Sequence, residues 1–136
     1  MIEVSVSINC PIKKVWGAWT TPEHIVKWNF ASPEWCCPKA SVDLKVGGQF
    51  SYTMASKDGN HQFDFLGTYS LIEEYVKLEV VLEDDRKLHV SFEQNEENTI
   101  VTERFEPENM NDIELQRSGW QAILNEFKSY VEREIQ

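Results

Sequence analysis

The sequence predicts an α+β fold in which a curved antiparallel β-sheet wraps around one long C-terminal α-helix. Alternating apolar residues mark a strand at the N-terminus and several more between residues 42 and 105. Two short helical patterns follow the first strand, and an amphipathic pattern occupies residues 112–134. Aromatic residues recur wherever the sheet and the last helix would face each other. We therefore expect an apolar pocket between them.

The overall composition favours a single soluble domain spanning residues 1–136. A chain of this size buries about two thirds of its unfolded surface, so it needs neither a disulfide nor a metal ion to fold. The net charge of −10 argues against nucleic acid as a partner, because phosphates would be repelled. No apolar run approaches the roughly 20 residues that span a bilayer, so we expect no membrane insertion. We also expect a monomer.

The cysteines and the N-terminus predict a cytoplasmic location. Cys10, Cys36 and Cys37 are odd in number and include an adjacent pair, which is not a disulfide framework. Reduced thiols in a cytoplasmic protein are the simplest interpretation. The chain begins directly with a strand pattern, and no signal peptide is recognisable.

The N-terminal third contains a strand and two helices. Ile2 to Ile8 alternates apolar with polar residues, which predicts a half-buried strand. Pro11 suits the first turn of a helix whose apolar side includes Trp16. Thr21 followed by proline predicts the start of a second helix, which we expect to include Trp28. Residues 29–41 hold two prolines and no clear period, which predicts a loop rich in bulky side chains.

The middle of the chain alternates strands with turns. We expect a strand over residues 42–46, a turn at Gly47-Gly48, and a hairpin turn at Asp58-Gly59. Further strand faces are predicted from alternating residues, with about six or seven strands in the sheet and the long helix starting at residue 111 or 112. These later strand faces lie at residues 50–54, 63–71, 78–82, 88–92 and 101–105.

Several short motifs together resemble a known family. They are Val15-Trp16, the segment 19–28 (WTTPEHIVKW), the segment 42–48 (VDLKVGG) with Phe50, Asp58-Gly59, Gly67-Thr68-Tyr69 and Gly119-Trp120. Across essentially its whole length the chain resembles homologues of the activator of the heat-shock-chaperone ATPase. This family lies within the START and birch-allergen-like (SRPBCC) superfamily of helix-grip proteins.

The resemblance implies a helix-grip fold with a cavity that, in related proteins, takes lipids, sterols, polyketides or other small apolar molecules. The eukaryotic namesakes bind the chaperone Hsp-ninety and stimulate its ATPase with the help of an additional N-terminal domain. The 136 residues include no such domain. A chaperone contact therefore stays an open alternative.

The polar residues predict no metal ion, no cofactor and no catalytic nucleophile. His24, His61 and His89 are far apart in the sequence and lack ligand spacing. Cys36 and Cys37 have no histidine nearby to serve as a base. Gly47-Gly48 lies between strands, where no helix N-terminus follows to bind phosphate.

One carboxylate is an exception by its position in a strand. Glu103 shares a face with Val101 and Phe105 and should point inward. Arg117, near the apolar side of the last helix, is its expected partner. Glu103 is then a member of a structural ion pair, a catalytic acid, or a polar anchor for a ligand. Without a partner, its pKa should rise through desolvation.

The aromatic surplus favours binding over catalysis. We predict a binding protein for a small apolar or aromatic ligand, lipid-like or polyketide-like in character. The alternatives are an enzyme of cyclase or hydrolase type, and a chaperone-interacting module of the stress response. The predicted ligand-binding residues are Trp28, Phe30, Trp35, Phe50, Tyr52, Met54, Phe63, Phe65, Tyr69, Phe92, Glu103, Arg117, Trp120 and Leu124.

Overall fold

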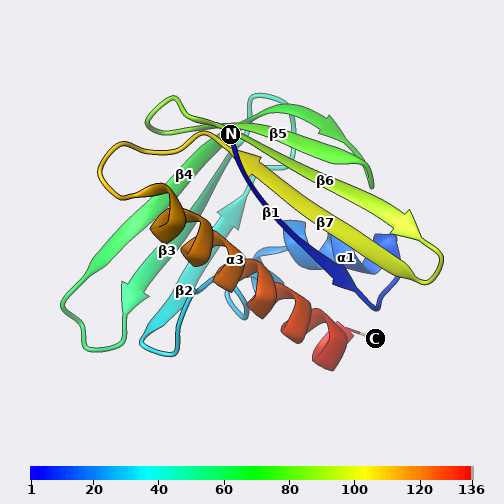
Figure 1. Ribbon diagram of the computed structural model, residues 1–136, viewed down its shortest axis with the longest axis horizontal. Coiled ribbons are helices and arrows are strands. Elements are labelled where there is room, and N and C mark those ends of the chain that lie inside the picture. Colours follow the sequence, from blue (N-terminus) through cyan, green and yellow to red (C-terminus); the bar gives the residue numbers. More distant parts are fainter. Residues whose placement is uncertain (136) are drawn as a thin grey trace.

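A computed structural model describes residues 1–135 and confirms the α+β architecture (Figure 1). A single seven-stranded sheet has the order β1-β7-β6-β5-β4-β3-β2, with every neighbouring pair antiparallel. The strands are β1 Ile2–Ile8, β2 Trp35–Val42, β3 Gln49–Ser56, β4 Gln62–Glu73, β5 Lys77–Leu82, β6 Lys87–Asn95 and β7 Asn98–Phe105. The helices are α1 Ile12–Thr20, α2 Pro22–Ile25 and α3 Ile113–Tyr130, followed by a π-helical turn, Val131–Ile135.

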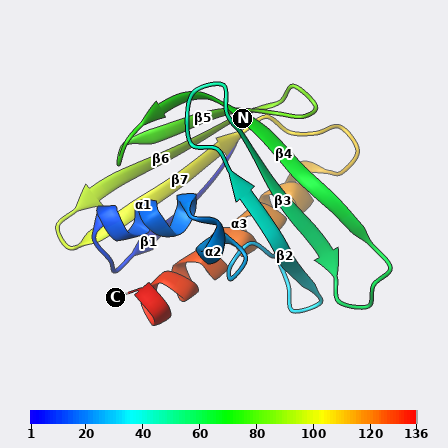
Figure 2. The ribbon, with the colours of Figure 1, turned by 180° about the vertical axis from the view of Figure 1, so that it is seen from behind.

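The sheet curves, and α3 lies across its concave face (Figure 1). Figure 2 shows α1 and α2 between the two arms of the sheet, near the C-terminal end of α3. Strand β1 is an edge of the sheet, and its free carbonyls are capped by the helix. Gln121 donates to the Ser5 carbonyl at 3.1 Å, and the Lys128 ammonium donates to the Ser7 carbonyl at 2.7 Å. These bonds attach α3 to the sheet and protect an exposed edge.

The C-terminal end of α3 packs into an aromatic core with α1 and α2. Trp19 stacks on Trp28 at 4.9 Å between ring centroids, and both meet the ring of Phe127 edge-on. The Trp28 indole donates to the Ala18 carbonyl at 3.1 Å, which satisfies its only polar atom. This dense packing fills one end of the space between sheet and helix.

The long helix begins where the sequence predicted. Asp112 is the N-cap, and its carboxylate accepts a hydrogen bond from the Leu115 N–H at 2.7 Å. The helix and its π-helical turn together end at Ile135, one residue beyond the predicted boundary. No helix within residues 1–135 is long and apolar enough to cross a membrane.

Three predictions about the N-terminal half of the chain are wrong. Trp35–Val42 forms the edge strand β2 rather than a loop, and the chain between Val42 and Gln49 is not a strand. A register shift between Cys36 and Lys39 interrupts the pairing of β2 with β3 around Pro38. An edge strand tolerates a proline because it needs no N–H on its free side. The bulge breaks the alternation that would otherwise have marked the strand. Trp28 lies in a turn beyond α2, which ends at Ile25.

Candidate functional site: an aromatic cavity with a buried carboxyl group

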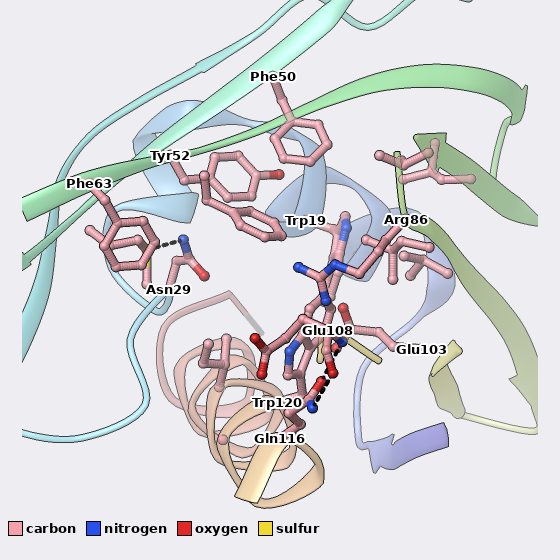
Figure 3. Close-up of a pocket in the computed structure, with 18 of the residues that line it drawn as sticks. Trp19, Asn29, Phe50, Tyr52, Phe63, Arg86, Glu103, Glu108, Gln116 and Trp120 are labelled. Atoms are coloured by element: carbon pink, nitrogen blue, oxygen red, sulfur yellow. Dashed lines mark hydrogen bonds between the residues drawn. The ribbon is translucent and has the colours of Figure 1, made fainter. Parts of the chain in front are cut away.

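A cavity of about 370 Å³ lies between the concave face of the sheet and the N-terminal half of α3 (Figure 3). Most of its wall is apolar, which is typical of small-molecule sites. Strands β3 to β7 supply half of the lining residues, and α3 supplies five, from Leu115 to Ile123. The lining residues of the sheet side are Phe50, Tyr52, Met54, Phe63, Phe65, Tyr69, Leu78, Val80, Leu88, Val90 and Glu103.

The aromatic rings form a continuous wall from β3 to α3. Phe50 stacks on Tyr52 at 4.6 Å and lies 5.6 Å from Tyr69. Phe65 meets Trp120 edge-on at 6.0 Å, and Trp120 stacks on Phe105 at 3.9 Å. These contacts hold the rings in place and leave other ring faces toward the cavity.

Gly67 makes room for this wall. It pairs with Phe50 across β3 and β4, and a Cβ at this position would lie 2.5 Å from the Phe50 ring. The same Cβ would lie 2.7 Å from a methyl group of Val80 on β5. Any side chain here would displace Phe50, so glycine is required by the packing.

Glu103 points inward, as its strand phase predicted. Only 5% of its surface is exposed, and it lines the cavity. Burial raises the pKa of its carboxyl group to about 8. No hydrogen bond or ion pair joins this side chain to any of residues 1–135. The carboxyl group is therefore largely protonated at neutral pH.

The predicted pairing of Glu103 with Arg117 is wrong. Arg117 pairs instead with Glu114 on the same helix, and its side chain is 41% exposed. Arg117 is half-buried and does not line the cavity, whereas Trp120, three residues later, does. Three residues rotate the helix by about 300°, so the side chains of Arg117 and Trp120 point about 60° apart.

Two tyrosines share the inner part of the cavity with Glu103. Tyr52 and Tyr69 are buried, and neither hydroxyl has a hydrogen-bond partner among residues 1–135. Burial raises the pKa of both Tyr52 and Tyr69. The nearby Tyr69 and Glu103 raise the pKa of Tyr52 further. Three polar groups thus face the cavity with unused hydrogen-bonding capacity.

Other polar residues of the wall are already engaged. Arg86, from the turn between β5 and β6, donates from Nε to Asp84 at 2.6 Å and from Nη1 to the Glu106 carbonyl at 3.3 Å. The Glu108 carboxylate accepts from the Met110 and Asn111 N–H groups, which holds its pKa below the usual range although partial desolvation opposes this. The side-chain amide of Gln116 accepts a hydrogen bond from the Glu108 N–H and donates one to the Glu108 carbonyl. Figure 3 shows these side chains beside Trp120.

The structure brings most of the predicted ligand-binding residues together at the cavity, and their role in binding stays a prediction. Nine of the fourteen line it: Trp28, Phe50, Tyr52, Met54, Phe63, Phe65, Tyr69, Glu103 and Trp120. Trp120 is half-buried rather than fully buried, because one of its sides faces the cavity. Phe63, near the start of β4, is 53% exposed although it lines the cavity.

Five predicted residues lie outside the cavity wall. Phe92 and Leu124 are buried in the core, where Phe92 meets Trp16 edge-on at 5.1 Å. Trp35 packs at the sheet edge against His61 and Phe63. Phe30 lies in the connection before β2, and Arg117 is a half-buried residue of α3 that pairs with Glu114. Strand and helix phase identify the inward side, but not which inward residues core packing covers.

Several lining residues were not predicted. Gln116 and Ile123 fall at the helical spacing of Trp120 and could have been found from that pattern. Trp19 could have been found from the apolar side of α1. Asn29, Arg86 and Glu108 come from turns or loops, where no periodicity indicates direction.

Within residues 1–135, no three histidine, cysteine or acidic side chains gather as a metal site. The cysteines are free thiols and none lines the cavity. Burial raises the pKa of Cys37, and its thiol donates to the Lys39 carbonyl. A raised pKa disfavours the reactive thiolate.

The fold and its cavity define the chain as a helix-grip protein with a ligand-sized hollow. Residues 9–132 match the family model described as Activator of Hsp90 ATPase homolog 1-like protein, and the chain belongs to this family. An AHSA1-like protein from Aeromonas hydrophila is 41% identical, with a TM-score of 0.88 over 96% of this chain and 92% of that one.

Two further solved structures support the same fold. A protein from Cytophaga hutchinsonii is 48% identical, with a TM-score of 0.84 over 97% of this chain and 92% of that one. A protein from Nitrosomonas europaea shares the fold at 19% identity, with a TM-score of 0.80 over 98% and 96% of the two chains. No curated protein matches the chain.

Proposed function

We propose that this protein is a cytoplasmic, monomeric binding protein for a small, largely apolar molecule of lipid-like, polyketide-like or aromatic character. The observation that carries the proposal is the cavity of about 370 Å³ with its wall of aromatic and aliphatic side chains. A hollow of this size within a well-packed domain is unusual, since protein interiors are close-packed. Free thiols at Cys10, Cys36 and Cys37 support a reducing compartment.

Apolar burial sets the expected affinity. A ligand that buries about 300 Å² of apolar surface gains on the order of 7 kcal/mol at about 25 cal/mol per Å². Stacking on the rings of Phe50, Tyr52 or Trp120 adds to this. Association costs several kcal/mol in lost freedom, so we expect dissociation constants in the micromolar range.

The test is a screen of flat and chain-like apolar compounds by thermal shift, followed by NMR titration of each hit. A compound that binds only the folded protein raises its Tm. Shift changes should gather on Phe50, Tyr52, Phe65, Tyr69 and Trp120. A screen without any saturable hit would overturn the proposal.

Two glycines offer a matched pair of variants. Gly119 of α3 lines the cavity, and a Cβ there meets nothing within 4 Å. Gly119→Leu should fill the cavity and abolish binding, while leucine in place of a helical glycine favours the helix. Gly17 of α1 has equally open surroundings but does not line the cavity. Gly17→Leu should bind like the wild type.

An enzyme of cyclase or hydrolase type is favoured by one observation. A buried carboxyl group with a pKa of about 8, as in Glu103, retains its proton at neutral pH and suits a general acid. Conversion of a bound hit, followed by mass spectrometry and lost in Glu103→Gln, would support this alternative. A hit recovered unchanged after long incubation would argue for binding alone.

Interaction with a chaperone is favoured by family membership, because the family is named for the Hsp90 ATPase activator. Stimulation of an Hsp90 ATPase by the purified protein would support this function. The Gly119→Leu variant separates it from ligand binding, since filling the cavity should leave a surface contact unchanged. No stimulation and no co-purification would count against it.

A further inference from the structure

The carboxyl group of Glu103 is the most unusual polar group in the cavity. It is 95% buried, faces the hollow and has no partner among residues 1–135. Buried carboxylates are normally paired or hydrogen-bonded, because an isolated charge in an apolar medium is costly. The described residues supply neither an ionic partner nor a hydrogen-bond donor to this carboxyl group. Glu103 is therefore available to a molecule that enters the cavity.

The surroundings of Glu103 are suited to a positive charge. Trp120, Tyr52, Tyr69 and Phe65 line the same cavity, and their ring faces attract cations. The hydroxyl oxygens of Tyr52 and Tyr69 can accept hydrogen bonds from an ammonium group. We propose that the cavity binds an organic amine in its protonated form, with the ammonium group on the Glu103 carboxylate and the apolar body against the aromatic wall.

The other charges of the wall are compatible with this assignment. Arg86 is the only cation in the described wall, and its guanidinium is paired with Asp84 at 2.6 Å. The remaining charged lining residue is the carboxylate of Glu108. The net charge of −10 also attracts cations toward the protein and repels anions. A ligand carboxylate would be repelled whenever Glu103 is ionised and would find no unpaired cation in the described wall, so fatty acids should bind less well than amines of equal size.

This inference rests on the proposed binding function and adds the charge of the ligand. It also predicts a proton release. Facing Glu103 are the phenols of Tyr52 on β3 and Tyr69 on β4, Arg86 of the β5–β6 turn, and Glu108 before α3. Val4 of β1 and Val90 of β6 flank Glu103 in the sheet and do not titrate. Glu103 is then the group that must lose a proton when an ammonium group arrives.

The sign of the pH dependence follows from the folded pKa of about 8. At pH 7 roughly nine tenths of Glu103 is protonated, so binding an ammonium ion should release close to one proton. Affinity for the amine should rise about tenfold between pH 7 and pH 9. An alcohol of the same shape carries no charge that would favour the ionised carboxyl group, so its affinity should not rise over this range.

The experiment uses three matched probes: 2-(2-naphthyl)ethylamine, 2-(2-naphthyl)ethanol and 3-(2-naphthyl)propionate. Calorimetric titration at pH 8 should show the amine binding at least tenfold more tightly than the alcohol, and the propionate most weakly. Glu103→Gln removes the charge at nearly constant shape and should reduce amine affinity to that of the alcohol. Glu93→Gln removes an exposed carboxylate from β6 and should behave like the wild type.

The outcomes test the amine assignment and the binding function separately. Equal binding of amine and alcohol, or amine binding that survives Glu103→Gln, overturns the amine assignment and leaves the binding function in place. Binding of none of the three probes, together with an empty library screen, overturns the binding function itself.

A second measurement needs only the wild type, in case Glu103→Gln fails to fold. Titration in buffers of different ionisation enthalpy counts the protons released. About one proton per amine and none per alcohol at pH 7 supports the assignment. No release with the amine overturns it.

Discussion

The unpaired Glu103 carboxyl group should make the stability of the free protein depend on pH in an unusual direction. Most acidic side chains stabilise a fold at neutral pH, whereas the folded pKa of Glu103 is raised from its ordinary 4.5 to about 8. The folded state therefore binds a proton more tightly than the unfolded state does. This stabilisation is fully present below pH 4.5 and is lost as pH rises through about 8.

The magnitude follows from the two pKa values. Each unit of difference is worth 1.36 kcal/mol, so the interval from 4.5 to about 8 corresponds to about 5 kcal/mol. Glu103→Gln keeps the shape of the side chain and removes its titration. The free energy of unfolding of the variant, minus that of the wild type, should increase by about 5 kcal/mol between pH 4.5 and pH 9.

Urea unfolding of both proteins at a series of pH values measures this difference. All other titrating groups are common to the two proteins and cancel in the subtraction. Glu93→Gln, on the exposed face of β6, supplies the baseline for removing one carboxyl group. Parallel curves for Glu103→Gln and wild type between pH 5 and pH 9 would refute the reasoning, because they would place the carboxyl group in water.

Three further substitutions test the packing around the cavity. Gly67→Ala should lower the free energy of unfolding by about 1–3 kcal/mol, because its Cβ would lie 2.5 Å from the Phe50 ring. Urea unfolding measures the loss, and an unchanged midpoint would contradict the packing described. Trp120→Ala should cost less than the roughly 3–5 kcal/mol of a fully packed tryptophan, since one side of the half-buried ring faces the cavity. Thermal unfolding reports this, and a larger loss would show that the ring fills a closed core. Asp112→Ala removes the N-cap of α3 and should cost about 1 kcal/mol. Asp43→Ala, in the exposed connection after β2, is the control, and equal losses would exclude a capping effect.

Alternation within strands identified much of the cavity wall. Phe50, Tyr52 and Met54 repeat every second residue, as do Val101, Glu103 and Phe105, so each set shares one face of the sheet. Because one face must be buried, the apolar members decide which face that is. The inward position of Glu103 follows from this rule alone.

Irregular elements were less accessible to this reasoning. The bulge around Pro38 hides strand β2, and α2 is too short to show a helical period. The positions of Arg86 and Glu108 depend on turns whose direction no local pattern encodes. The position of such a residue depends on how the turns connect the strands and helices in three dimensions.

The sequence by itself determined the order of the elements, the inward faces of the strands and the start of α3 at Asp112, because each depends on neighbours along the chain. Only the tertiary structure decided that Phe92 and Leu124 lie in the core while Trp120 faces a hollow. It also decided that Arg117 turns to Glu114 and leaves Glu103 unpaired. The physical reason is that periodicity assigns a residue to a side of its element, whereas contact and empty space depend on distances between elements.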